Sequence, residues 1–367
     1  MKKELELEAM STWLPTNGLP AVISGPCSAE TESQTIATAK QLAATGKVNA
    51  LRAGIWKPRT RPGQYEGSGA EGLAWLIQAK KETGLPVTTE VANASHVEAC
   101  LKAGVDILWV GARTTVNPFS VQEIADSLKG VDIPVMVKNP VNPDLELWIG
   151  ALERLNKAGI KKLAAIHRGF SSFDKGPFRN APMWDLAIEL KTRIPELDIL
   201  CDPSHIAGNR ELIALISQKA IDLNMSGLMI ESHINPDAAW SDAKQQVTPA
   251  VLGNIIEGLV ARKPSTDNKN FKDTLAVLRE QIDQLDDEIM QKLAKRMTIS
   301  EKIGQYKKEN NVTILQVGRW EEIIATRLAM SMAMGLSEEF IKDMLKLIHN
   351  ESIQIQTKVM NKESERV

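Results

Sequence analysis

The chain has 367 residues, of which 43% are hydrophobic and 25% charged, and its formal net charge is -2 at pH 7. This length exceeds one average domain and favours one large domain plus one small one. The balanced charge argues against an acidic tail or a nucleic-acid-binding arm. An aromatic content of 4% argues against a platform for stacking bases.

The cysteines and the N-terminal residues indicate a compartment. Cys27, Cys100 and Cys201 are too few and too widely spaced for a disulfide framework, which favours a reducing environment. The start, MKKELELEAM, has glutamates after two lysines and does not resemble a signal peptide. No run approaches 18 uncharged apolar residues, so we expect no membrane span, and we expect a cytoplasmic protein.

Short apolar runs rich in β-branched residues recur along the first 262 residues. They lie at residues 21–24, 48–53, 86–91, 106–111, 133–138, 162–167, 197–202 and 227–232. Amphipathic stretches such as 72–84 and 209–220 lie between them. This alternation predicts a (β/α)8 barrel over residues 1–262. An open, doubly wound sheet is the alternative, although it normally has fewer strands and a Gly-rich turn after the first one.

The composition then changes. Residues 263–272 are polar, include Pro264 and show no periodicity, so we predict a linker there. No proline follows it, and residues 273–367 have helical periodicity, which predicts a small all-α domain. Its first helix, from 273 to about 310, would be roughly 55 Å long and favours a bundle or a dimer. Further helices are expected at 317–333 and 337–360.

In a barrel of this kind, chemistry lies where the strands end. One set of residues there is cationic: Arg52, Lys57, Arg59, Arg113, Lys138 and Arg168. Any one of them alone reads as a surface or ion-pairing residue. Six cations at one mouth would repel one another unless anions filled it, so together they predict a substrate with several negative charges.

A second set at the strand ends has metal-ligand chemistry. It consists of Cys27, His205, Glu231 and Asp242. A thiolate, an imidazole and two carboxylates suit a divalent transition metal. Their spacing along the chain is too wide for a zinc-finger pattern.

Both sets lie in motifs that together resemble the 3-deoxy-D-arabino-heptulosonate 7-phosphate (DAHP) synthases. The likeness is closest to the branch related to 3-deoxy-manno-octulosonate 8-phosphate synthase. The motifs, in order, are GPCS (25–28), LRAG (51–54), KPRT (57–60), GAR (111–113), VKN (137–139), HRG (167–169), DPSH (202–205) and the run from Ile230 to Ala243. The KPRT motif separates this family from the eight-carbon synthases, which remain a weaker alternative.

The resemblance implies that phosphoenolpyruvate, D-erythrose 4-phosphate and water give DAHP and phosphate. It implies that Cys27, His205, Glu231 and Asp242 bind a divalent ion of the Mn²⁺, Fe²⁺, Co²⁺ or Zn²⁺ class. Phosphoenolpyruvate would be bound by Arg52, Lys57, Arg113, Lys138 and Arg168. Arg59 and Thr60 would hold erythrose 4-phosphate, and Lys57 would also protonate or steer the reacting groups.

Cations recur in the helical segment. Arg279 and Arg296 are 17 residues apart, which on one straight helix means about 25 Å and faces about 100° apart. They therefore cannot hold one small dianion together. Arg296 and Lys307 share a face, so a site that uses all three needs Arg279 of a second chain. A coiled coil without chemistry is the plainer alternative.

This spacing, with Arg319 and Gln356, resembles the all-helical chorismate mutases, which are intertwined dimers. The resemblance implies a homodimer that rearranges chorismate to prephenate. Arg296 and the second chain's Arg279 would pair with the carboxylates, Lys307 and Gln356 would bond the ether oxygen, and Arg319 would support the carboxylate side. The family usually has an acidic residue where this chain has Trp320, and commonly an aspartate at Gln316. The alternative is a domain that senses chorismate or prephenate and regulates the barrel without turnover.

Overall fold

The structure is a computed structural model that describes residues 5–14, 16, 20–56, 63, 65–173, 176–263 and 265–361. The chain divides into two compact units, residues 1–264 and 265–367. The division falls within the polar segment 263–272.

The first unit is a closed barrel of eight parallel strands, in which each strand pairs with its neighbours in sequence and β8 pairs with β1. The strands are β1 (Ala21–Gly25), β2 (Ala50–Arg52), β3 (Val87–Val91), β4 (Ile107–Val110), β5 (Val135–Lys138), β6 (Leu163–His167), β7 (Asp198–Cys201) and β8 (Gly227–Glu231). Seven of them lie within a predicted run, and β1 extends one residue past the first run, to Gly25. Closure confirms the (β/α)8 barrel and excludes the open sheet, which would leave two unpaired edges.

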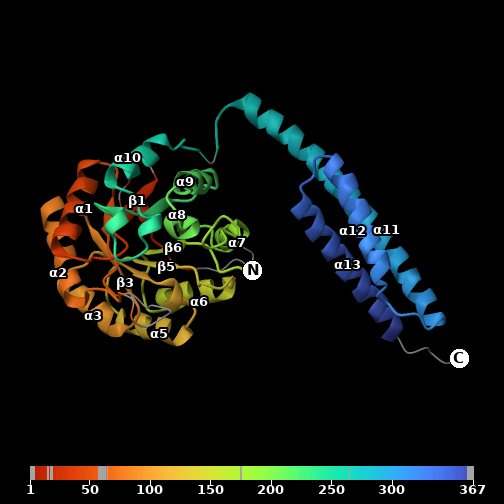
Figure 1. Ribbon diagram of the computed structural model, residues 1–367, viewed down its shortest axis with the longest axis horizontal. Coiled ribbons are helices and arrows are strands. Elements are labelled where there is room, and N and C mark those ends of the chain that lie inside the picture. The colour runs from red at the N-terminus through yellow and green to blue at the C-terminus, as the bar shows by residue number, and fades with distance from the viewer. Residues whose placement is uncertain are drawn as a thin grey trace. The chain divides into compact units, whose positions relative to one another are not determined.

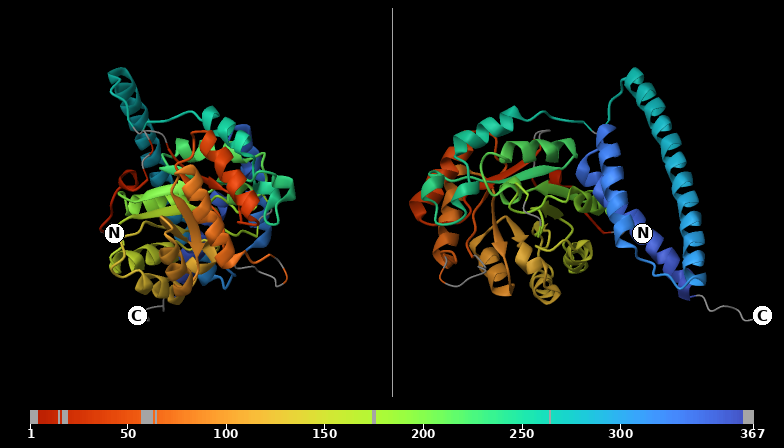
Figure 2. Two further views of the ribbon diagram at one scale, coloured as in Figure 1. Left: turned by 90° about the vertical axis from the view of Figure 1, so that its left-hand side faces the viewer. Right: turned by 45° about the vertical axis from the view of Figure 1, so that its right-hand side comes forward.

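Helices surround these strands (Figures 1 and 2). They are α1 (Glu32–Ala44), α2 (Gly69–Thr83), α3 (Ala94–Ala103), α4 (Ala112–Thr115), α5 (Pro118–Ser127), α6 (Leu145–Lys157), α7 (Trp184–Arg193), α8 (Pro203–Ala207), α9 (Ile213–Asp222) and α10 (Pro249–Gly258), with short 3-10 turns η1 (Met10–Thr12), η2 (Pro236–Ala238) and η3 (Ala243–Gln245). Side chains of Thr31, Asn93 and Asp144 accept bonds from first-turn N–H groups, which fixes where α1, α3 and α6 begin.

The core has two layers. One lies between strands and helices, and the other fills the inside of the barrel with side chains such as Ile107, Trp109 and Met136. Met10 and Leu14 join this inner layer, and the Met10 N–H donates to Asp198 Oδ2 at 2.7 Å, where β7 begins. The N-terminal ends of the strands are therefore covered, which leaves the opposite ends for chemistry.

The second unit contains α11 (Lys269–Glu309), α12 (Val317–Ala333) and α13 (Glu338–Asn361). These confirm the three predicted helices, although α11 begins four residues before position 273. α13 packs against both α11 and α12, and Figure 1 shows it beside the C-terminal part of α11. α11 carries an apolar stripe of four side chains, Leu278, Ile282, Leu285 and Ile289, that are 50–58% exposed. No helix among the described residues is long and apolar enough to cross a membrane.

Candidate functional site

The C-terminal ends of the strands bring predicted site residues together. Arg52, Lys138 and Glu231 are the last residues of β2, β5 and β8, and all three are buried. Arg168 follows β6 directly and is also buried, whereas Arg113 in α4 is exposed. Lys57, Arg59 and Thr60 lie outside the described residues.

Three of the four predicted metal ligands form a cluster. One ligand atom each from Cys27, Glu231 and Asp242 lies within 4.8 Å of the others. Cys27 Sγ is 3.3 Å from Asp242 Oδ2. His205 lies beside this cluster, with its Nε2 3.8 Å from Glu231 Oε1.

The backbone near Cys27 is shaped by close approach. Gly25 has a φ of +154°, and a Cβ there would lie 1.9 Å from the carbonyl oxygen of Arg52. Only glycine fits this position, so the chain can bring Cys27 against β2. The Cys27 backbone N–H donates a hydrogen bond to Oε1 of the Gln246 side chain at 2.9 Å.

Asp202 links His205 to the cationic set. Its Oδ2 is 2.8 Å from Lys138 Nζ and 2.8 Å from His205 Nδ1, while its Oδ1 accepts the His205 N–H at 3.0 Å. Burial alone would raise the pKa of Asp202, but His205 and Lys138, which both lie against its carboxylate, outweigh burial and hold that pKa well below its usual value. Burial lowers the pKa of His205, which favours a neutral ring. With Nδ1 against Asp202, Nε2 is the nitrogen directed toward Glu231.

Two cations flank one aromatic ring inside the mouth. The Arg52 guanidinium lies 4.9 Å from the ring centre of Trp109, and Lys138 Nζ lies 5.6 Å from it. Arg52 Nη2 is also 3.3 Å from Glu231 Oε1. The ring faces and carboxylates thus stabilise buried positive charge.

Arg168 is held from two sides. Its backbone N–H donates to Asn139 Oδ1 at 2.7 Å. Nη1 of its side chain donates to Asn180 Oδ1, also at 2.7 Å. Burial lowers the pKa of Arg168 to about 10, so it remains charged near pH 7. Arg113 and Arg179 contribute to this lowering, which means that further cations are within electrostatic reach.

Sequence reasoning missed several residues of this site. Asp202 is part of DPSH but was assigned no role, and Arg179, Asn180 and Gln245 were not selected. Arg179 Nη1 donates to Asp242 Oδ1 at 3.1 Å, and Gln245 Nε2 donates to Glu231 Oε2 at 2.6 Å. The sequence signals were the place of Asp202 in the DPSH motif and the adjacent glutamines, Gln245 and Gln246, shortly after Asp242.

A second site lies in the helical unit, in a pocket of about 590 Å³. Its polar and aromatic lining residues are Lys292, Lys295, Arg296, Ser300, Lys307, Gln316, Arg319, Trp320, His349, Ser352 and Gln356. Among the described residues that line it there is no carboxylate. This composition suits a ligand with more than one negative charge.

The pocket holds the predicted side chains at different depths. Arg296 Nη1 donates to Ser352 Oγ, and Lys307 Nζ donates to the Ile314 carbonyl, each at 2.5 Å. Burial lowers the pKa of both Arg296 and Lys307. Gln356 is buried against α11, whereas Arg319 is largely exposed and pairs with Glu322 at 2.6 Å.

Trp320 occupies this pocket with a ring partner. Its indole stacks on the His349 imidazole with centroids 4.0 Å apart. Burial, with the nearby charges of Arg296 and Lys307, lowers the pKa of His349. A neutral aromatic pair therefore stands where the mutase resemblance calls for a carboxylate. Arg279 lies on the exposed part of α11 and is not among the lining residues.

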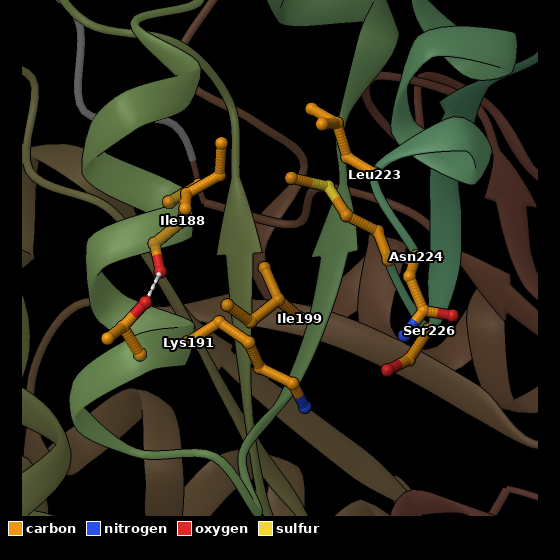
Figure 3. A pocket seen from close by; sticks show the side chains of 9 residues that line it. Ile188, Lys191, Ile199, Leu223, Asn224 and Ser226 are labelled. Carbon is orange, nitrogen blue, oxygen red and sulfur yellow. Dashed lines mark hydrogen bonds between the residues drawn. The ribbon is translucent and has the colours of Figure 1, made fainter. Parts of the chain in front are cut away.

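A further pocket, of about 190 Å³, lies at the other end of the barrel (Figure 3). It is lined by α7, the start of β7 and the segment before β8, including Ile188, Lys191, Ile199 and Leu223. Lys191 Nζ donates a hydrogen bond to the Leu197 carbonyl at 2.7 Å. This pocket contains no predicted site residue, and it lies at the N-terminal ends of the strands.

Comparison with known proteins gives each unit its own match. The family model described as DAHP synthetase I family matches residues 9–263. The model described as chorismate mutase type II matches residues 278–357.

Individual relatives agree with the first match. The phospho-2-dehydro-3-deoxyheptonate aldolase of Thermotoga maritima is 32% identical over 241 residues, covering 66% of this chain and 69% of that protein. The 2-dehydro-3-deoxyphosphooctonate aldolase of Burkholderia vietnamiensis is 27% identical over 267 residues, covering 65% and 89%.

A solved structure agrees as well. The crystal structure of the Thermotoga maritima enzyme aligns with a TM-score of 0.60 at 30% identity, covering 66% of this chain and 68% of that one. The two family matches make the chain a bifunctional enzyme. The chain belongs to the DAHP synthetase I family and carries a chorismate mutase type II domain on its C-terminal side.

Proposed function

We propose that the barrel unit condenses phosphoenolpyruvate with D-erythrose 4-phosphate and water to give DAHP and inorganic phosphate. The observation that carries this proposal is the cluster of Cys27, Glu231 and Asp242 beside buried Arg52 and Lys138 at one mouth. The name of the Thermotoga maritima relative, a heptonate aldolase, supports the seven-carbon product.

The cations would bind and orient phosphoenolpyruvate. Arg52, Lys138 and Arg168 would hold its phosphate and carboxylate, with Arg113 at the exposed rim. Because the side chains of Arg52, Lys138 and Arg168 are already held by Trp109, Asp202 and Asn180, little reorganisation would accompany binding.

The residues of the cluster fit a divalent ion. Cys27, His205, Glu231 and Asp242 would hold it, since they offer a thiolate, a neutral imidazole and two carboxylates. An ion of the Mn²⁺, Fe²⁺, Co²⁺ or Zn²⁺ class would supply Lewis-acid polarisation of the aldehyde of erythrose 4-phosphate.

Beyond the cations and the metal ligands, the bond-forming steps need few further side chains. The methylene carbon of phosphoenolpyruvate attacks the aldehyde carbon, water adds to the enol carbon, and loss of phosphate leaves a 2-keto acid. Lys57 would protonate or steer the reacting groups, and Arg59 and Thr60 would hold the phosphate of erythrose 4-phosphate. These three assignments rest on the KPRT motif.

Replacement of one thiol tests the proposal. Cys27→Ala should abolish phosphate release from phosphoenolpyruvate with erythrose 4-phosphate and leave the fold intact. Cys100→Ala is the matched control, because Cys100 is equally buried but lies in α3, where burial raises its pKa to about 12. Full activity of the Cys27→Ala protein with a chelator present would refute the metal site. Turnover of arabinose 5-phosphate and none of erythrose 4-phosphate would establish the eight-carbon alternative.

For the helical unit we propose the rearrangement of chorismate to prephenate. Arg296, Lys307 and Gln356 all line one pocket, which supports this assignment. Arg296 and Arg279 of the partner subunit would pair with the two carboxylates. Lys307 and Gln356 would bond the ether oxygen as negative charge develops there, and Arg319 would support the carboxylate side. The exposed stripe of α11 would be covered by a second copy of the chain.

A non-catalytic sensor is the competing proposal, and Trp320 in the pocket favours it. The full chain should form prephenate from chorismate, and Lys307→Ala should stop this without changing synthase activity. Binding of chorismate without turnover, together with a change of synthase rate on adding prephenate, would leave only the sensor.

A further inference from the structure

Glu231 and Asp242, the two carboxylates of the proposed metal site, each have one oxygen near the other residues of the cluster. The second oxygen of each accepts a hydrogen bond from a residue outside the cluster. Glu231 Oε1 lies 3.3 Å from Arg52 Nη2 and 3.8 Å from His205 Nε2, while its Oε2 accepts a bond from Gln245 at 2.6 Å. Asp242 Oδ2 lies 3.3 Å from Cys27 Sγ, while its Oδ1 accepts a bond from Arg179 at 3.1 Å.

The two outer partners are bonded to each other. Arg179 Nη1 donates to Gln245 Oε1 at 2.5 Å. A continuous chain of hydrogen bonds therefore runs from Asp242 through Arg179 and Gln245 to Glu231. It joins two connections that are far apart in sequence, the one between β6 and α7 and the one that contains η3.

Both outer residues are placed by their surroundings. The Arg179 N–H is held by the carbonyls of Ile206 and Ala207 at 3.0 and 3.3 Å. Gly208 has a φ of +70°, and a Cβ there would lie 2.4 Å from the Cβ of Arg179. Gln245 is buried at 1% exposure in η3. The position of this pair is thus set by the fold.

The geometry at Asp242 needs such support. Its backbone has a φ of 48°, in the left-handed region that non-glycine residues rarely adopt. Glu231 and Asp242 also lie close to Cys27 in a buried place, so their charges repel one another unless outside groups offset them. A bond to the outer oxygen of each carboxylate fixes which oxygen faces the ion.

We propose that Gln245, tied to Arg179, is a positioning residue that orients Glu231 and thereby sets the affinity of this site for a divalent ion. The proposal rests on the metal site proposed above. Gln245 contacts neither substrate nor ion in this role, and it acts only through Glu231.

Metal affinity measures this role without using turnover. Metal-free protein is titrated with Co²⁺, and the near-ultraviolet thiolate-to-cobalt absorption reports the ion at Cys27. Gln245→Met keeps the length and the neutral charge of the side chain but removes the donor, so the affinity should fall 10- to 100-fold. Arg179→Lys keeps the charge but loses the fork that reaches both partners, so a loss of about three- to tenfold is expected.

The chain offers a matched control. Gln122 in α5 accepts a bond from Arg154 in α6 at 2.9 Å, so Gln122→Met breaks the same kind of pair on the outside of the barrel. It should leave the Co²⁺ affinity within twofold of the parent. Arg179 is half exposed, so Arg179→Lys is compatible with folding even if Gln245→Met is not.

Two results would overturn the inference, and they are distinguishable. If the parent protein shows the cobalt absorption and both Gln245→Met and Arg179→Lys bind Co²⁺ within twofold of it, the metal site stands and the positioning role fails. If the parent protein shows no such absorption, the metal site itself fails and the inference fails with it.

Discussion

The barrel and the helical unit hold their charged groups in different ways. In the barrel, Lys138 and Asp202 are almost wholly buried and lie 2.8 Å apart. In the helical unit, Arg319 and Glu322 form a pair whose side chains are 59% and 58% exposed. Arg279, in α11, is exposed.

The difference follows from architecture. Eight strand ends around a closed barrel bring buried side chains to one mouth within a single chain. The pocket of the helical unit is lined by side chains of three helices, and α11 keeps an exposed apolar stripe at Leu278, Ile282 and Leu285. We infer that the barrel site is organised by its own fold and that the helical site is completed by a second chain.

The largest expected effect tests that contrast. Arg279→Ala and Arg296→Ala should each lower mutase turnover about 10²- to 10³-fold, because each removes a charged partner of the substrate. If Arg279 acts on the other chain, equal mixing of the two variant proteins after subunit exchange restores about a quarter of the parent activity. Half of the random dimers are then mixed, and one of their two sites has both arginines. Prephenate formation is the measurement.

The same mixing can contradict the inference. No recovery in samples where subunit exchange is shown by mass would mean that Arg279 serves its own chain, and parent-like turnover of Arg279→Ala alone would mean that Arg279 has no role. Synthase activity should be unchanged in both variants, which makes it the internal control.

Next in size is the effect of breaking the buried network. Asp202→Asn removes the carboxylate that faces both Lys138 Nζ and His205 Nδ1, and should lower the free energy of unfolding of the barrel by about 3 kcal/mol. Glu338→Gln in α13 removes the partner of Lys342, an exposed pair worth less than about 0.5 kcal/mol. Urea unfolding followed by tryptophan fluorescence gives both values. If Asp202→Asn and Glu338→Gln lowered the free energy of unfolding equally, the buried pair of the barrel would not differ in strength from the exposed pair of the helical unit.

Much of the fold was predictable because it is periodic. The eight apolar runs and the three helices follow from patterns that repeat within the sequence, and strand ends then point to Arg52, Lys138 and Glu231. The 25 Å separation of Arg279 and Arg296 also follows from the sequence, because both lie in one unbroken α11. The functional roles of these residues stay predictions.

The rest of the site depends on irregular segments. Arg179 and Gln245 come from connections without periodicity, and their positions are set by tertiary contacts such as those with Ile206 and Glu231. Nothing in the local sequence indicates that Asp242 adopts a left-handed backbone. The pairing of Trp320 with His349 likewise joins two helices and becomes visible only once they pack.

The smallest expected effect concerns helix packing at the mutase pocket. A Cβ at Gly304 in α11 would lie 3.1 Å from Cα and Cγ of Gln356, closer than ordinary contact. Gly304→Ala gains up to about 1 kcal/mol of helix propensity but pushes Gln356 by a few tenths of an ångström, so the stability should change by less than about 1 kcal/mol. Gly150→Ala in α6 has open space and should show the propensity gain alone. Because Gln356 would bond the developing charge on the ether oxygen, Gly304→Ala should still lower mutase turnover several-fold. Unchanged turnover would show that the pocket does not depend on where Gln356 lies, and would weaken its assigned role.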